Sequence, residues 1–396
     1  MALATNLMNQ YSMLLPADHI ISDKDIASLG RLLPEALVSI KDPFLDSNVN
    51  FQDDGKDYLV SRKARQGISK VAGNVSAQLR NGVTLDGKHV AGLQQTVSEM
   101  MEYVLTNPVT NAVIEKSMSW DDYLQEHCAN VFYLSLLIGN TVKNYIKRER
   151  ERLSAAKSIK NAMDLNPLAT AALLHDIGMV PLSYLYSKNE PLTPEEVEKV
   201  RQHPTVGSEM LPSQIDPMVK LIIKLHHENC DGTGYPQGLP GDKVNIFAKI
   251  VRVADAYSSA VCDKVYCKAK HPAIVLHEML NTSISNCYDP VILKVFSGIV
   301  QPFSIGSKLL LNNGKWAVVV RYNDKKPFNP KIVIAYDEFG DPEMPQVASV
   351  IHELGEDDSL KVKSFAGYDM TALQNEKYDS GLESDSTQEL FGLHYP

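Results

Sequence analysis

LLHDIGM at residues 173–179 and HHENCDGTGYP at residues 226–236 are the two stretches that decide how this sequence is interpreted. The first runs from an apolar segment directly into His175 and Asp176. Adjacent residues cannot point the same way on a helix, so we expect the chain to present both side chains to one site where a helix ends. The second stretch begins with a pair of histidines and continues into a turn rich in glycine.

Two further segments carry residues of the same kind, HPTVG at 203–207 and RVADAYSS at 252–259. The four segments place imidazoles and carboxylates on separate helices, and none of the candidate residues is a cysteine. An aspartate can bridge two metal ions through its two oxygens, whereas a histidine supplies one terminal nitrogen. A mixed set of this kind favours iron, manganese or zinc.

Each residue alone also has a structural interpretation. A single histidine on an apolar helix face is usually a core residue, and an aspartate near a helix end is usually a cap. The GTGYP stretch alone is a good turn, because Gly232 and Gly234 allow positive φ and Pro236 stiffens the chain. The occurrence of all these features in order is what favours a metal site.

The composition of the chain restricts which partners and which cellular location we expect. The chain has 396 residues and a formal net charge of −9, so we expect no broad binding to nucleic acid or to an anionic membrane surface. An anionic substrate would need local positive charge, for example from metal ions. We find no secretory signal, no apolar run that approaches the length of a membrane span, and no CxxC pair among five cysteines, so we expect a cytoplasmic, reduced protein.

The helical and β patterns divide the chain into four regions. Residues 1–118 are expected to be an accessory or regulatory region, starting with a small α+β unit and including a helix around residues 89–105. Residues 119–300 are expected to be all helical, with a capping box from Thr193 to Glu196 and a second N-cap at Asp216. Residues 301–368 predict a small β domain with a turn at Asn313 and Gly314, and residues 369–396 an acidic, mobile tail.

Over residues 119–300 the four segments resemble the HD-GYP family, a branch of the HD-domain metal phosphohydrolases. The resemblance implies a mainly α protein built on an HD-type helical bundle, with a bi- or trinuclear metal centre. It also implies hydrolysis of the bacterial second messenger cyclic di-GMP to pGpG or GMP, by a hydroxide that bridges the metals. The flanking α+β unit and the C-terminal β segment resemble those of some members more weakly.

By position, the resemblance assigns seven metal ligands and makes Asp176 the bridging, catalytic carboxylate. Some members have a glutamate four residues before the first histidine that helps to bind a third metal. Here that position is Tyr123, so we expect two divalent ions, iron or manganese, with zinc, nickel or magnesium as alternatives. The expected ligands are His127, His175, Asp176, His203, His226, His227 and Asp255. For His127 the alternative is a surface histidine on an amphipathic helix.

The resemblance also points to substrate and partner contacts. Gly234, Tyr235 and Pro236 match the GYP signature, which shapes one wall of the substrate site and has been linked to partners such as GGDEF-type signalling proteins. Lys264 and Lys268 are further candidates for holding the substrate.

Two departures from the family pattern lower the expected activity. Met179 replaces the usual lysine, and Ser258 replaces a second aspartate. On a continuing helical turn, Met179 would lie near the metal-facing side, three residues after Asp176. A degenerate member that binds metal or nucleotide as a sensor or interaction module therefore stays open, as does a hydrolase of another cyclic dinucleotide.

Overall fold

The computed structural model describes most of the chain from residue 55 to residue 371, and four short strands before it. The described ranges are 55–81, 87–106, 120–153, 164–186, 192–262, 270–281, 283–303, 305–323, 326–355, 359–365 and 367–371. They fall into two compact units. A helical unit lies within Asp53–Ser304 and Asn323–Phe328, and a β unit within Met1–Gln52, Ile305–Tyr322 and Asn329–Gln374.

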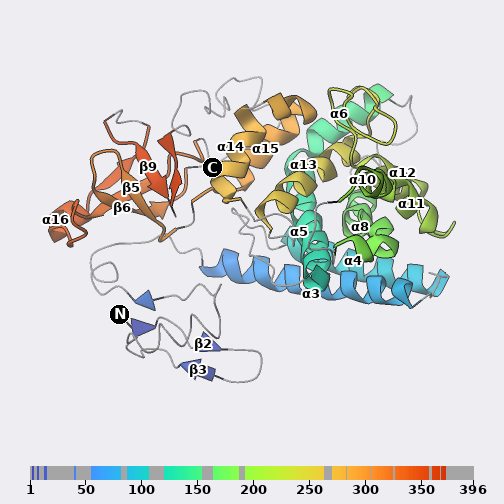
Figure 1. The fold of residues 1–396 in the computed structure, drawn as a ribbon, viewed down its shortest axis with the longest axis horizontal. Helices are drawn as coiled ribbons and strands as arrows, with labels where there is room; N and C mark the ends of the chain where they lie inside the picture. The colour runs from blue at the N-terminus through green and yellow to red at the C-terminus, as the bar shows by residue number, and fades with distance from the viewer. Residues whose placement is uncertain are drawn as a thin grey trace. The chain divides into compact units, whose positions relative to one another are not determined.

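The helical unit is built around α5 (Trp120–Thr141), whose residues from Cys128 to Ile138 are all buried. Helices α3 (Gly55–Arg80), α8 (Asn166–Leu174) and α13 (Ile246–Val261) pack against α5 (Figure 1). A central helix that is apolar on every side needs such neighbours around it. The predicted helical bundle is confirmed.

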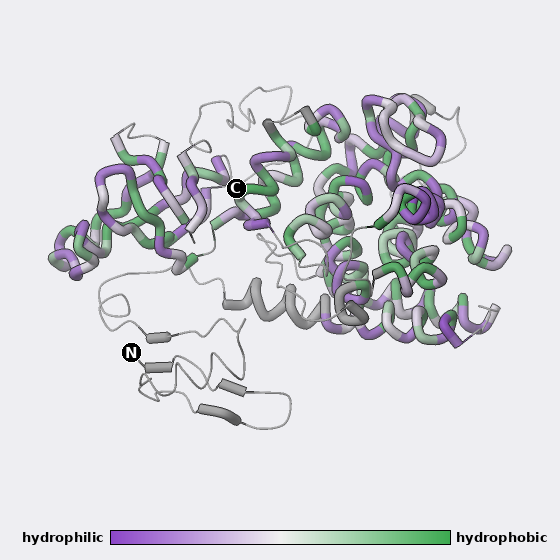
Figure 2. The backbone as a smooth tube through the Cα atoms, viewed as in Figure 1, coloured by the Kyte–Doolittle hydropathy of each residue, from purple (hydrophilic) through white to green (hydrophobic). Residues whose placement is uncertain are grey.

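The described part of the helical unit contains ten further elements. They are α4 (Gly87–Thr106), α6 (Lys143–Leu153), η1 (Ile177–Leu182), α9 (Ser183–Tyr186), α10 (Pro194–Arg201), α11 (His203–Met210), α12 (Pro217–Leu225), α14 (Pro272–Asn281), η2 (Ser283–Cys287) and α15 (Pro290–Ile299). Helix α10 is hydrophilic along its length (Figure 2) and has no buried residue. The predicted caps are confirmed: Thr193 and Glu196 form a capping box, and Asp216 accepts the N–H of Met218.

The compact unit begins earlier than the boundary expected at residue 119. Helix α4 corresponds to the helix predicted around residues 89–105. It buries Val90, Leu93, Val97 and Val104 and packs against α5 and α8. Helix α3 packs against α5, α8 and η1. Both helices therefore belong with the bundle, because their apolar faces are covered by it.

The β unit contains an antiparallel sheet in the order β10-β9-β5-β6-β7-β8. Its strands are β5 (Lys308–Leu311), β6 (Trp316–Arg321), β7 (Lys331–Tyr336), β8 (Ile351–Glu353), β9 (Val362–Phe365) and β10 (Tyr368–Asp369), with the short helix α16 (Pro345–Ala348) before β8. Gly314 has a φ of 86°, as the turn between β5 and β6 requires. The predicted C-terminal β segment is confirmed.

Near the N-terminus, β1 (Ala2–Leu3) pairs with β4 (Ile40–Lys41) and β2 (Leu7–Met8) with β3 (Met13–Leu15). The helical part of the expected α+β unit and the acidic tail beyond residue 371 lie outside the described residues.

One apolar segment, Asn166–Leu185, has the length and composition of a membrane span, so the expectation that no run approaches that length was wrong. It is divided among α8, η1 and α9, and 72% of the apolar window is buried inside the protein. These are the properties of a core segment, and the segment includes His175 and Asp176.

Candidate metal centre

The structure brings all seven predicted ligands to one place, although they come from five parts of the chain. His127 lies in the middle of α5 and Asp255 in the middle of α13. The other five lie where helices end or begin: His175 and Asp176 between α8 and η1, His203 as the first residue of α11, and His226 and His227 directly after α12. Asp176 occupies the N-cap of η1, but its side chain makes no capping hydrogen bond.

The two oxygens of Asp176 face different histidines. Oδ1 lies 3.1 Å from Nε2 of His203 and 3.9 Å from Nε2 of His226. Oδ2 lies 3.5 Å from Nε2 of His175 and 3.7 Å from Nε2 of His127. The carboxylate therefore stands between two groups of histidines, as a bridging ligand would.

We call these the inner and the outer group. The inner group is His127, His175 and Asp255, and the Oδ1 atom of Asp255 lies 3.1 Å from Nε2 of His127. The outer group is His203, His226 and His227. The second oxygen of Asp255 lies 3.7 Å from Nδ1 of His227, so this residue also reaches the outer group.

Hydrogen bonds to the backbone determine how three of the imidazoles are oriented. In His175, His203 and His226 the Nδ1 atom contacts the carbonyl oxygen three residues earlier, at 2.9, 2.7 and 2.6 Å. A carbonyl only accepts, so Nδ1 carries the hydrogen and Nε2 presents a lone pair to the centre. These contacts of Nδ1 with the backbone fix the tautomer that a metal ligand needs.

The donor set fits divalent cations. In the outer group, Nε2 of His203 and Nε2 of His226 lie 3.2 Å apart, and Oδ1 of Asp176 lies 3.1 Å from the first of them. In the inner group, the Nε2 atoms of His127 and His175 are also 3.2 Å apart. Ligand atoms about 2.1 Å from one ion are separated by roughly 3.0–3.4 Å at octahedral or tetrahedral angles. Acceptor atoms facing one another in this way need a cation between them.

Burial and charge set the protonation states. Burial lowers the pKa of His226 to about 3, and it also lowers the pKa values of His175 and His227. Burial opposes ionisation of Asp176 and Asp255, but the surrounding histidines outweigh it and hold both carboxyl pKa values well below their usual range. Neutral imidazoles and ionised carboxylates are the forms that bind metals.

His203 differs from the other histidines. Burial acts to lower its pKa, but the hydrogen bond and the charge of Asp176 raise it above the usual value. In the metal-free protein, a proton on His203 therefore offsets part of the negative charge of Asp176, as a metal ion would.

The centre opens on one side. The side chain of His227 is 19% exposed and that of Asp176 is 15% exposed, whereas Asp255 is 8% exposed and the remaining ligands are nearly inaccessible. Solvent, and any substrate, therefore reaches the centre past His227 and Asp176.

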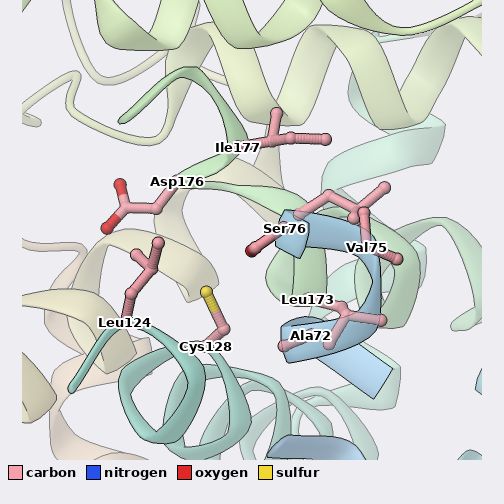
Figure 3. A pocket seen from close by; sticks show the side chains of 9 residues that line it. Ala72, Val75, Ser76, Leu124, Cys128, Leu173, Asp176 and Ile177 are labelled. Atoms are coloured by element: carbon pink, nitrogen blue, oxygen red, sulfur yellow. The ribbon is translucent and has the colours of Figure 1, made fainter. Parts of the chain in front are cut away.

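A small cavity lies beside Asp176 (Figure 3). Its volume of about 10 Å³ is close to that needed by one water molecule. Helix α3 contributes one wall, and α5 and α8 contribute others, so a helix from before residue 119 reaches the neighbourhood of the centre. The lining residues are Ala72, Val75, Ser76, Leu124, Cys128, Leu173, Leu174, Asp176 and Ile177.

The GYP loop forms the wall beside the outer group. The ring of Tyr235 stacks on His227, with centroids 4.7 Å apart and an interplanar angle of 25°. Burial raises the pKa of the Tyr235 phenol, the carboxylates of Asp255 and Asp176 raise it further, and the guanidinium groups of Arg252 and Arg201 oppose the change. Tyr235 is therefore a neutral phenol at physiological pH.

The glycines of this loop act differently from one another. Gly232 has a φ of 80°, as expected, but the expectation of positive φ for Gly234 was wrong. A Cβ atom at Gly234 would lie 2.3 Å from the backbone nitrogen of Asn229. Only glycine fits there because two backbone segments meet, a reason that the turn pattern did not reveal.

Glu228 holds the loop and was not singled out from the sequence. Its side chain is buried and accepts the N–H groups of Gln237 at 2.7 Å and Leu239 at 2.8 Å. A glutamate immediately after the histidine pair was the sequence signal that could have identified it.

The two departures from the family pattern have structural explanations. Met179 is buried in an apolar cluster with Leu185, Leu182, Leu192 and Val200, so the expectation that it lies on the metal-facing side was wrong. The chain after Asp176 continues as the tighter helix η1, which changes the direction of its side chains. Ser258 is buried and its hydroxyl lies 2.9 Å from Nδ1 of His127.

Lys264 and Lys268 lie outside the described residues, as does the side chain of Tyr123.

Comparisons with known proteins agree with this site. A family model described as an HD domain matches residues 133–292, a range that includes every expected ligand except His127. The chain is 25% identical over 284 residues to the cyclic di-GMP phosphodiesterase PA4108 of Pseudomonas aeruginosa, covering 71% of this chain and 64% of that protein. It is 30% identical over 182 residues to the cyclic di-GMP phosphodiesterase PdeB of Borreliella burgdorferi, covering 44% and 48%.

A third relative is named as a 3'3'-cGAMP-specific phosphodiesterase 3, from Vibrio cholerae, and is 32% identical over 124 residues, covering 30% of this chain and 26% of that protein. The solved structure of Bd1817, a HDG"Y"P protein from Bdellovibrio bacteriovorus, aligns over 75% of this chain and 94% of the other at 16% identity, with a TM-score of 0.38. The chain thus spans between about half and two thirds of the length of the first two relatives.

Residues 133–292 therefore form an HD domain, and in its HD and GYP motifs the chain resembles the HD-GYP proteins.

Proposed function

We propose that this chain is a metal-dependent phosphodiesterase that hydrolyses cyclic di-GMP to pGpG or GMP at two divalent cations. The observation that carries the proposal is the position of Asp176, whose two oxygens face two separate groups of inward-pointing histidines. The names of relatives that match over the HD domain support the same substrate class.

When bound, the cations would supply Lewis-acid chemistry, lowering the pKa of water and polarising a phosphoryl oxygen. The chain itself supplies a rigid donor set, because three of its imidazoles are fixed by backbone carbonyls. Asp176 is ionised and faces the opening, so it is placed to accept a hydrogen bond from an attacking water. We assign it the catalytic role, and we assign all seven residues as ligands.

Several finer assignments belong to the same proposal. We propose iron or manganese as the native ions, since carboxylate and imidazole ligands together suit them. Gly234, Tyr235 and Pro236 form a wall of the substrate site, with Lys264 and Lys268 as further contacts. The exposed tip of the loop is the surface offered to GGDEF-type partners, in a cytoplasmic setting, while residues 1–118 act as an accessory region.

A second candidate substrate is 3'3'-cGAMP, which two relatives carry in their names. Both substrates have two phosphodiesters and purine bases, so the metal centre alone does not separate them. The alternative from a different class is a binding module that retains metals without turnover.

A single set of assays on the purified chain tests these possibilities. The protein is prepared with iron or with manganese, its metal content is measured by elemental analysis, and hydrolysis of cyclic di-GMP, 3'3'-cGAMP and cyclic di-AMP is followed by chromatography. We expect close to two ions per chain and turnover of cyclic di-GMP. Two ions with nucleotide binding but no turnover would favour the binding module, and a metal content near zero would contradict the centre itself.

A further inference from the structure

Two arginines lie beside Tyr235, on the open side of the metal centre. Arg201 is exposed at the end of α10, and its guanidinium carbon lies 5.3 Å from the centroid of the Tyr235 ring. Tyr235 in turn stacks on His227, so Arg201 contacts a ring that itself lies against a residue of the outer group. A cation held over an aromatic face keeps its position without losing its charge.

Arg252 approaches the same region from α13. It lies three residues before Asp255, on the same face of the helix. Its Nε atom donates to Oδ1 of Asn229 at 2.9 Å, and its guanidinium carbon lies 5.3 Å from the centroid of the Tyr288 ring. Asn229 belongs to the segment that leads into the GYP loop. Arg252 is thus oriented by neutral partners on the loop side of the centre.

The charges of both arginines are available to a ligand. Within the described ranges, neither guanidinium has a carboxylate oxygen within 4.0 Å. On a chain with a net charge of −9, and next to a centre with two ionised aspartates, such unneutralised cations suit an anion rather than the protein's own stability. The family's lysine position does not supply this charge here, because Met179 lies in an apolar cluster.

We propose that Arg201 and Arg252, the arginine rim, bind the phosphodiester of a cyclic dinucleotide that is not being hydrolysed. This inference rests on the proposed function. A cyclic dinucleotide carries two phosphodiesters, and only one can lie at the cations. The other then needs its own counter-charge, and a planar guanidinium matches a phosphate with two parallel hydrogen bonds.

The test compares two substrates in the metal-loaded full chain. Cyclic di-GMP has two phosphodiesters, whereas bis(p-nitrophenyl) phosphate has one and needs the metal centre alone. Arg201→Ala is expected to raise KM for cyclic di-GMP about tenfold, the effect of one charge-assisted hydrogen bond, and to leave hydrolysis of bis(p-nitrophenyl) phosphate unchanged. Arg252→Gln, which keeps a donor for Asn229, is expected to act in the same direction.

The matched control is Lys199→Ala, which removes one exposed positive charge from the same helix, α10. It should leave both substrates unaffected. An equal loss with Lys199→Ala would mean that net charge alone steers the substrate, and an equal loss on both substrates with Arg201→Ala would mean damage to the centre. Either result would contradict phosphodiester binding by the arginine rim, and so would an unchanged KM for cyclic di-GMP in both arginine variants.

A different result is expected if the proposed phosphodiesterase function is wrong. If the wild type hydrolyses neither substrate, the affinity for cyclic di-GMP is measured by calorimetry on the same metal-loaded proteins. A weaker affinity in Arg201→Ala, but not in Lys199→Ala, still supports the rim in a binding module. Equal affinities in all three proteins contradict it.

Discussion

The inner and outer groups of the metal centre use the same kinds of ligand in different surroundings. The inner group is sealed, with His127 on a central helix and His175 fully buried. The outer group ends in His227, which is partly exposed and covered by Tyr235 on a loop. The comparison indicates that the inner position is built for retention of an ion and the outer position for access by substrate. Asp176 is the residue that joins the two.

The largest effect on metal binding and activity is expected from substituting Asp176, which links the two groups. Asp176→Asn removes one negative charge shared by both groups, so we expect both ions to be lost together and hydrolysis to fall by more than the roughly 10- to 100-fold typical of a supporting residue. Elemental analysis and kinetics on the folded variant measure this. Full metal content with only about 1 kcal/mol of lost stability would instead indicate a capping aspartate.

The next effect concerns Met179, which belongs to neither group. Met179→Lys places a charge in an apolar cluster, so we expect the free energy of unfolding to fall by more than about 2 kcal/mol. Met179→Leu is the control and should cost less than about 1.5 kcal/mol. Denaturant unfolding of both variants decides. A stable lysine variant with faster turnover would show that this position does reach the substrate.

A substitution at Ser258 tests whether the inner and outer groups bind their ions independently. Ser258→Ala removes the hydrogen-bond partner of His127 Nδ1, so we expect the inner ion to bind about 10- to 100-fold more weakly and the outer ion to be unaffected. Titration of the metal-free chain with Mn²⁺ resolves the two sites. Ser258→Thr keeps the hydroxyl and should restore the inner affinity; equal weakening of both sites would mean that the groups are not separable.

The smallest effect is the pH dependence of the metal-free protein. His175, His226 and His227 have folded pKa values below the unfolded value, and that of His226 is about 3. Between pH 6.5 and about 4 the unfolded chain therefore binds more protons at these three residues, and stability falls as the pH falls. His203, with its raised pKa, acts in the opposite direction, but its effect lies above pH 6.5, where the folded chain binds more protons at this residue. Thermal unfolding in the presence of a chelator across this range measures the slope, and a stability that rises toward acid would contradict it.

The sequence predicted which residues meet at the centre, because five of the seven lie in short motifs where a helix ends or begins; His127 and Asp255 lie within α5 and α13 instead. It predicted the caps at Thr193 and Asp216 for the same reason, since capping depends on residues a few positions apart. It could not place Met179, because the tight turn of η1 is decided by packing. It did not reveal the contact of Ser258 with His127, which joins residues 131 positions apart, or the approach of Arg201 to Tyr235.

The positions of the histidines at helix ends have an electrical consequence. Helices α8 and α12 each finish at the centre, next to His175 and His226. The C-terminus of a helix carries a partial negative charge of about half an elementary charge. Two such ends, added to two ionised carboxylates, create a negative potential that favours cations and repels phosphate. The metal-free centre should therefore repel a nucleotide, whereas the metal-loaded centre should bind it. Metal binding should thus come before nucleotide binding.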